Sequence, residues 1–154
     1  MQASALGHFM RDSGPWTYAI VNLVHVLGIS TLFGSILVLD LRLVGVGRRV
    51  PLAALSSAVV PVAATGFVIA ATTGVGLLAT KATEYVGNPF LLVKFPAIAL
   101  GLINAAAVRF TGAWRAHQLR DLTPAEERRL AVLGGVSLLC WLTAITAGRM
   151  IAYW

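Results

Sequence analysis

Residues 50–80 read VPLAALSSAVVPVAATGFVIAATTGVGLLAT and contain no charged side chain. A helix that crosses the hydrocarbon core of a bilayer, which is about 30 Å thick, needs about 20 predominantly apolar residues. This stretch is longer than that requirement. It therefore predicts a membrane-spanning helix over residues 51–79.

Three other apolar stretches repeat this pattern on either side. They predict spans over residues 15–41, 89–110 and 128–150. Asn88 is expected to cap the third span, and the sequence TPAE at residues 123–126 fits a capping box before the fourth. Each helix should begin at a proline, because proline is favoured at the first helical position; these are Pro15, Pro51, Pro89 and Pro124.

The composition of the whole chain is typical of a membrane protein. Of its 154 residues, 58% are hydrophobic and 12% are charged, against roughly 45–50% and 25% in soluble domains. We therefore predict an all-α fold, an integral membrane four-helix bundle that forms a single transmembrane domain over residues 1–154. An enzyme acting alone is not expected, because the sequence shows no nucleophile–base pair, paired carboxylates or phosphate-binding loop.

The net charge of +6 is distributed unevenly along the chain. Basic residues collect after the first predicted span and between the third and the fourth, and such loops face the cytoplasm. Both termini should therefore lie on the outer side, which is the periplasm in a Gram-negative bacterium. Nucleic-acid binding is not expected, because these short loops lack the interleaved aromatic residues of a stacking platform.

Ionisable side chains within the spans point to function, because each costs roughly 2.5–3.5 kcal/mol on insertion scales. His25, Lys94 and Arg149 are the three that need an explanation. From the rise along a helix, all three should lie about 7–15 Å below the outer ends of their helices. Asn22 stands three residues before His25 and adds a polar group to the same helix face. We expect one outward-facing pocket with an excess of positive charge.

An anionic cofactor would balance that charge. In the favoured interpretation the pocket binds haem b or a similar anion, with Lys94 and Arg149 on its carboxylates and His25 as axial ligand or hydrogen-bond donor. The protein would then be a redox-associated subunit that takes part in electron transfer. Asp40 and Arg109 lie at similar depth at the inner end, which predicts an interhelical ion pair.

Two alternatives remain open. Copper handling would use soft sulfur and imidazole ligands, and the candidates are His8, Met10, His25 and Met150. In the other alternative the protein is a ligand-free accessory subunit of a larger membrane complex. Lys94 and Arg149 would then extend to the interface, while His25 would hydrogen-bond to a neighbouring helix.

Small residues at four-residue spacing recur on the helices and allow close helix approach in lipid. We expect most of them to serve packing within the chain. The ridge Gly66-Ala70-Gly74 is the best candidate for contact with another chain. The protein is accordingly expected to be a homo-oligomer or a subunit of a larger membrane assembly.

Three stretches carry a resemblance to a known family: VHVLGISTLFGSILVLDLRLVG (24–45), NPFLLVKFPAIALGLINA (88–105) and AGRMIAYW (147–154). They resemble a family of small bacterial four-helix membrane proteins that is distantly similar to the membrane domain of copper-resistance protein D. The resemblance implies a bacterial inner-membrane location and copper or haem handling. The chain departs from a copper permease in having four spans and no methionine-rich segment. The positions that the resemblance singles out are His25, Asp40, Lys94, Asn104 and Arg149.

Overall fold

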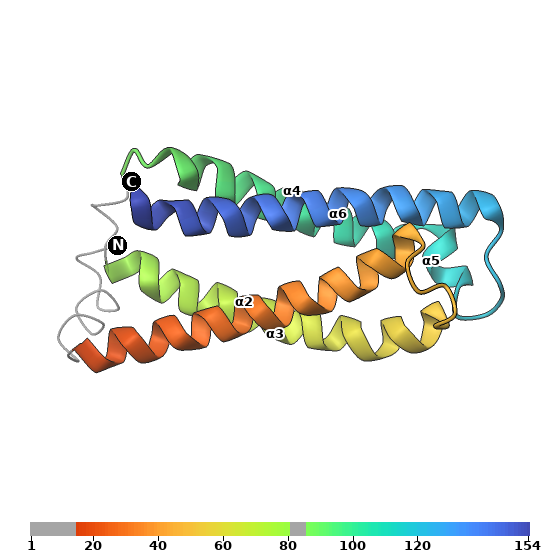
Figure 1. Cartoon of the computed structure of the whole chain (residues 1–154), viewed down its shortest axis with the longest axis horizontal. Coiled ribbons are helices and arrows are strands. Elements are labelled where there is room, and N and C mark those ends of the chain that lie inside the picture. The colour runs from red at the N-terminus through yellow and green to blue at the C-terminus, as the bar shows by residue number, and fades with distance from the viewer. Residues whose placement is uncertain (1–14, 81–85) are drawn as a thin grey trace. The chain divides into compact units, whose positions relative to one another are not determined.

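The computed structural model describes residues 15–80 and 86–154, and 86% of this part of the chain is helical, with no strand in it. The long helices are labelled in Figure 1. In chain order the elements are α2 (Pro15–Val44), α3 (Leu52–Thr80), α4 (Pro89–Phe110), α5 (Gly112–Ala116), α6 (Pro124–Met150) and the 3₁₀ helix η1 (Ile151–Tyr153).

Four of the described helices are long and apolar enough to cross a membrane: α2, α3, α4 and α6. Their most apolar windows are between 11% and 28% buried within the chain. Large apolar side chains therefore cover the outer surface of these helices, as a bilayer requires and water does not favour. The all-α, membrane-spanning prediction is confirmed, and the protein is a multi-pass membrane protein in contact with lipid.

The helix boundaries follow the predicted start signals. The Asn88 side chain accepts a hydrogen bond of 2.9 Å from the Phe90 N–H at the start of α4. Thr123 and Glu126 form the predicted capping box, so α6 begins at Pro124, four residues before the expected span. The five-residue helix α5 was not expected, and Thr111 caps it through a 3.1 Å bond from the Trp114 N–H.

The chain divides into two compact units. Of the described residues, 15–34, 61–80 and 86–87 belong to the first unit, which holds the N-terminal part of α2 and most of α3. The second unit comprises residues 35–60 and 88–154, which hold the remainder of these two helices together with α4, α5 and α6.

In the first unit, α2 and α3 touch through their backbones. A Cβ atom on Gly66 would stand 2.5 Å from the Leu32 backbone nitrogen, and one on Gly28 would stand 2.8 Å from that of Ala70. Gly74 lies against the His25 ring. The ridge Gly66-Ala70-Gly74 therefore packs within the chain, and its predicted contact with another chain is wrong because α2 already occupies it.

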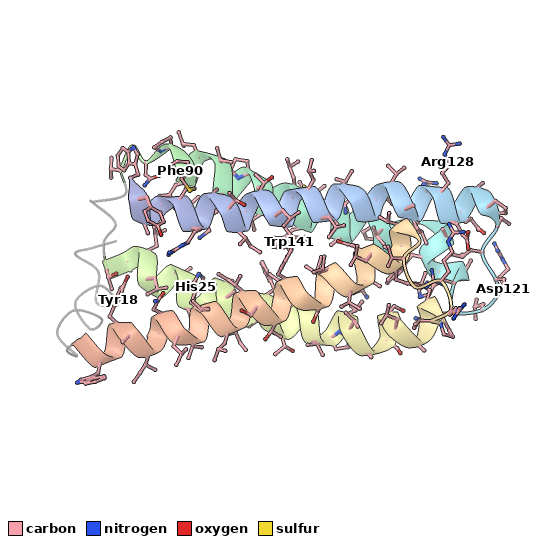
Figure 2. All side chains as sticks on the ribbon, viewed as in Figure 1. Tyr18, His25, Phe90, Asp121, Arg128 and Trp141 are labelled. Atoms are coloured by element: carbon pink, nitrogen blue, oxygen red, sulfur yellow. The ribbon has the colours of Figure 1, made fainter. Side chains whose placement is uncertain are left out.

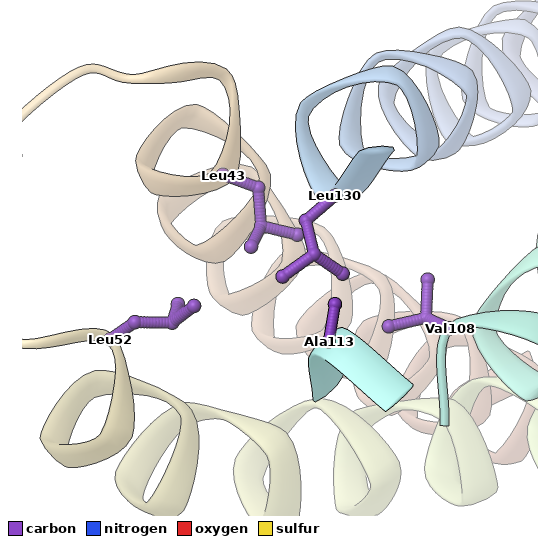
Figure 3. Close-up of a cluster of buried hydrophobic side chains, with 5 residues drawn as sticks. All are labelled: Leu43, Leu52, Val108, Ala113 and Leu130. Carbon is purple, nitrogen blue, oxygen red and sulfur yellow. The ribbon is translucent and has the colours of Figure 1, made fainter. Parts of the chain in front are cut away.

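In the second unit, α4 and α6 pack along their length and α5 lies beside both. The Trp141 ring of α6 fills the space left by Gly101 of α4, where a Cβ would lie 3.2 Å from the indole. A cluster of buried side chains closes the end of this unit near α5 (Figure 3). Its members are Leu43, Leu52, Val108, Ala113 and Leu130.

Candidate functional site

Lys94 lies where α4 meets the C-terminal end of α6. Its side chain is half-buried, and its Nζ atom is 3.5 Å from the position that a Cβ on Gly148 would occupy. The absence of a side chain at Gly148 thus makes room for the lysine. Among the described residues, no carboxylate lies within ion-pair distance of this ammonium group. An uncompensated charge between two membrane helices is costly unless water or an anion reaches it.

Arg149 follows Gly148 directly and lies near the end of α6. Its Nη2 atom donates a 2.6 Å hydrogen bond to the Tyr153 hydroxyl, and its guanidinium carbon is 5.0 Å from the centre of the same ring. The side chain is exposed, and no described carboxylate forms an ion pair with it. Hydrogen bonding and cation–π attraction leave its positive charge in place. Lys94 and Arg149 therefore bring two cations to one end of the α4–α6 pair.

His25 belongs to the first unit, where it joins α2 to α3 (Figure 2). Its Nδ1 atom is 3.0 Å from the Thr73 hydroxyl oxygen, and that hydroxyl donates to the Ile69 carbonyl at 2.6 Å. The hydroxyl proton is thus used, so Thr73 accepts from the His25 Nδ1–H. The neutral ring is then the tautomer with its proton on Nδ1 and its lone pair on Nε2. The same tautomer is found in metal-bound histidines whose Nδ1–H is fixed by a second group.

His25 belongs to the first unit, whereas Lys94 and Arg149 belong to the second. The expected pocket that contains all three side chains therefore stays a prediction. The hydrogen bond between helices that the ligand-free alternative expects of His25 is present. Asn22, which was expected to share the polar face of His25, is exposed on α2.

Asn104, which the family resemblance singled out, is buried in the second unit. Its Nδ2 group donates a 3.0 Å hydrogen bond to the Leu133 carbonyl of α6. It lies ten residues beyond Lys94, which corresponds to about 15 Å along α4. This bond fixes the contact between α4 and α6, and a role for Asn104 in cofactor binding stays a prediction.

The expected copper ligands divide between described and undescribed parts of the chain. His8 and Met10 lie outside the described residues. Met150 is 39% exposed at the end of α6. Within residues 15–80 and 86–154, no group of three or more His, Cys, Asp or Glu side chains is placed to hold a metal ion.

The predicted ion pair between Asp40 and Arg109 is wrong. Asp40 is 4% exposed and lies beside the Ser137 side chain of α6, whereas Arg109 is exposed and forms no ion pair with it. Equal depth in the membrane therefore did not bring the two side chains together, because the rotation of each helix decides which residues meet. The second carboxylate oxygen of Asp40 is buried without a hydrogen-bond partner in the described structure.

A buried polar cluster near α5 was not anticipated. The His117 Nδ1–H donates to the Trp114 carbonyl, and its Nε2 is 2.9 Å from the Ser56 hydroxyl at the start of α3. Burial lowers the pKa of His117, and the bond to Trp114 opposes this shift in part. Ser56 and His117 are 61 residues apart, so no local motif could have identified the pair.

Comparison of the chain with protein-family models, curated proteins and solved structures found no match. The resemblance to the membrane domain of copper-resistance protein D therefore stays a prediction.

Proposed function

We propose that this chain is an accessory subunit of a bacterial inner-membrane redox assembly and binds an anionic cofactor at the end of its α4–α6 pair. The observation that carries the proposal is Lys94, a half-buried ammonium group packed against Gly148 without a described counter-charge. Arg149, the next residue after Gly148, supplies a second cation. A dicarboxylate or similar anion would neutralise both groups and remove the cost of placing them there.

Haem b is the candidate that the sequence favours. Its two propionates are negatively charged and would serve as the counter-charges of Lys94 and Arg149. When bound, haem b would supply one-electron chemistry. The planar guanidinium of Arg149 suits a carboxylate, and its contact with Tyr153 orients it. We further propose, from the distribution of arginines, that both termini face the periplasm and that the chain works in a homo-oligomer or a larger complex.

The test is an optical spectrum of the protein isolated from its native membrane and, separately, after expression with added haem. We expect a Soret band that shifts on reduction. Lys94→Met and Arg149→Gln should each weaken binding by about tenfold or more, because each removes a charged hydrogen-bond donor. Arg128→Gln, an equal loss of charge near the other end of α6, is the matched control and should change nothing.

Absence of a Soret band from both preparations would falsify haem binding. Equal occupancy in the Lys94→Met and wild-type proteins would show instead that a bound haem does not depend on these cations. Elemental analysis of the same preparation tests copper handling, which requires stoichiometric copper that falls when Met10 and Met150 are replaced.

A ligand-free structural subunit is the second candidate, and the contact between His25 and Thr73 favours it. In this candidate the polar side chains only fix helix packing. Lys94→Met should then leave folding intact or raise the unfolding free energy, because an unpaired charge is removed from between two helices. Neither haem nor copper should accompany the purified protein.

A further inference from the structure

A cavity of about 690 Å³ lies in the second unit, at the end where α2 turns into α3. It opens between this turn and the segment that joins α5 to α6. Its apolar wall includes Leu43, Leu52 and Leu130, which belong to the buried cluster of Figure 3. This site is separate from the Lys94 end of α4, because it lies beyond the opposite end of that helix.

Four arginines line the cavity, and three come from the α2–α3 segment: Arg42, Arg48 and Arg49. Arg42 is fixed in place, because its Nε donates to the Val50 carbonyl at 2.7 Å and its Nη2 to the Arg48 carbonyl at 3.3 Å. Carbonyl oxygens satisfy the donors of Arg42 but do not cancel its charge. Among the described residues, no carboxylate forms an ion pair with any of these three arginines.

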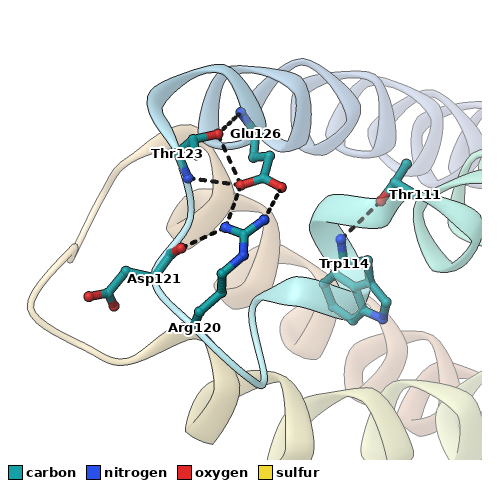
Figure 4. Close-up of polar contacts among 6 residues, drawn as sticks. All are labelled: Thr111, Trp114, Arg120, Asp121, Thr123 and Glu126. Atoms are coloured by element: carbon teal, nitrogen blue, oxygen red, sulfur yellow. Dashed lines mark hydrogen bonds and ion pairs between the residues drawn. The ribbon is translucent and has the colours of Figure 1, made fainter.

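The acidic side chains lie on the opposite wall. Arg120, the fourth arginine, donates two hydrogen bonds of 2.8 and 2.9 Å to Glu126 and is neutralised by it (Figure 4). Asp121 and Glu127 also line the cavity, and both belong to the α5–α6 side. The cavity is therefore polarised, with its uncompensated positive charge on the α2–α3 side.

We propose that this cavity binds a phosphate group through Arg48 and Arg49. Both arginines are exposed, and the Arg48 guanidinium lies over Gly45, which has φ +117° and leaves room for it. A guanidinium donates two parallel hydrogen bonds to a phosphate, which makes arginine the side chain suited to this anion. The low-dielectric wall of leucines strengthens the attraction relative to an open surface. The phosphate can belong to a lipid headgroup or to a free ion.

The experiment separates these two sources. The wild-type protein in an uncharged detergent is titrated with inorganic phosphate and, separately, with mixed micelles that contain phosphatidylglycerol or phosphatidylcholine. Binding is followed by phosphorus NMR and by native mass spectrometry at constant ionic strength. We expect saturation at one phosphate group per chain.

The double variant Arg48→Gln/Arg49→Gln should weaken this binding by about tenfold or more. The matched control is Arg109→Gln/Arg115→Gln, which removes the same charge from two exposed arginines that do not line the cavity. It should weaken binding less than about twofold, through the general field alone. Arg42 is left unchanged because it holds the turn together. Arg48→Lys/Arg49→Lys keeps the charge and should give an intermediate affinity, since lysine lacks the paired donors.

The outcomes are distinct. Binding of phosphatidylglycerol without inorganic phosphate assigns the site to a lipid headgroup, and binding of both assigns it to the phosphate group itself. Failure of the wild-type protein to bind either probe overturns the proposal. Equal losses in the two glutamine variants overturn it as well, because they would show a diffuse charge effect. A preserved helical circular dichroism spectrum confirms that each variant is folded. If the Arg48→Gln/Arg49→Gln variant does not fold, the affinity of the Arg48→Lys/Arg49→Lys variant is compared with that of the wild-type protein.

Discussion

Two helix contacts, one in each unit, use glycine for different purposes. In the first unit, Gly66 and Gly28 let the backbones of α2 and α3 touch, since an added Cβ would meet backbone atoms at 2.5 and 2.8 Å. In the second unit, Gly101 makes room for a side chain, because a Cβ added there would lie nearest to the Trp141 ring, at 3.2 Å. A backbone cannot move aside without its whole helix, whereas a ring can shift. The two contacts should therefore differ in their tolerance of a single methyl group.

The largest effect is expected for Gly66→Ala. The new methyl group would overlap the Leu32 backbone and separate α2 from α3, so we expect a loss of about 3 kcal/mol in unfolding free energy. Unfolding by SDS in mixed micelles, followed by circular dichroism, measures this loss. The matched control is Gly34→Ala in α2, where a Cβ meets nothing within 4 Å. That control should be neutral or slightly stabilising, because alanine favours the helix. Equal losses in both variants would contradict the backbone contact.

A smaller effect is expected for Gly101→Ala. Its Cβ would crowd the Trp141 ring by a few tenths of an ångström, which should cost about 1 kcal/mol. Combining it with Trp141→Phe, a smaller ring, should recover part of this loss. The double-mutant cycle, measured by the same SDS unfolding, should give a favourable coupling energy. Additive losses would mean that the methyl group meets something other than the indole.

The smallest effect concerns pH and is confined to the second unit. Burial lowers the pKa of His117 from its usual value of about 6.5. Below pH 6.5 the unfolded chain therefore binds a proton that the folded chain resists, so the unfolding free energy falls as the pH falls. Above about pH 6.5 His117 is neutral in both the folded and the unfolded chain, so its full contribution to the unfolding free energy is present. The slope from one proton cannot exceed about 1.4 kcal/mol per pH unit.

His117→Gln is the variant that isolates this slope, because the other histidines are retained. We expect the wild-type protein to lose more stability between pH 7 and pH 5 than the variant does. SDS unfolding at a series of pH values provides the comparison. Parallel curves for the two proteins would show that His117 does not couple folding to pH.

The long helices could be predicted from the sequence because their signals are local. The uncharged residues 50–80, the Asn88 cap and the capping box at Thr123 each depend on a few neighbouring residues, and all three appear in the structure. Helix α5 was missed because five residues carry no usable periodicity.

The side-chain partners were harder to predict, because they depend on helix rotation. The depth of Lys94 and Arg149 along their helices placed both near one end of the α4–α6 pair, as the contact of Lys94 with Gly148 shows. Depth along the helix gave the wrong partner for Asp40, whose neighbour is Ser137 and not Arg109. The sequence pattern carries no information about which of several residues at one depth faces inward when all helix faces are apolar.

The turn between α2 and α3 has a consequence for how the protein is made. Arg42 hydrogen-bonds to carbonyl oxygens of residues 48 and 50, so the turn closes on its own backbone. Neither α4 nor α6 is needed for these bonds. The turn can therefore close as soon as residue 50 has left the ribosome, before α3 (Leu52–Thr80) and the second half of the chain have emerged.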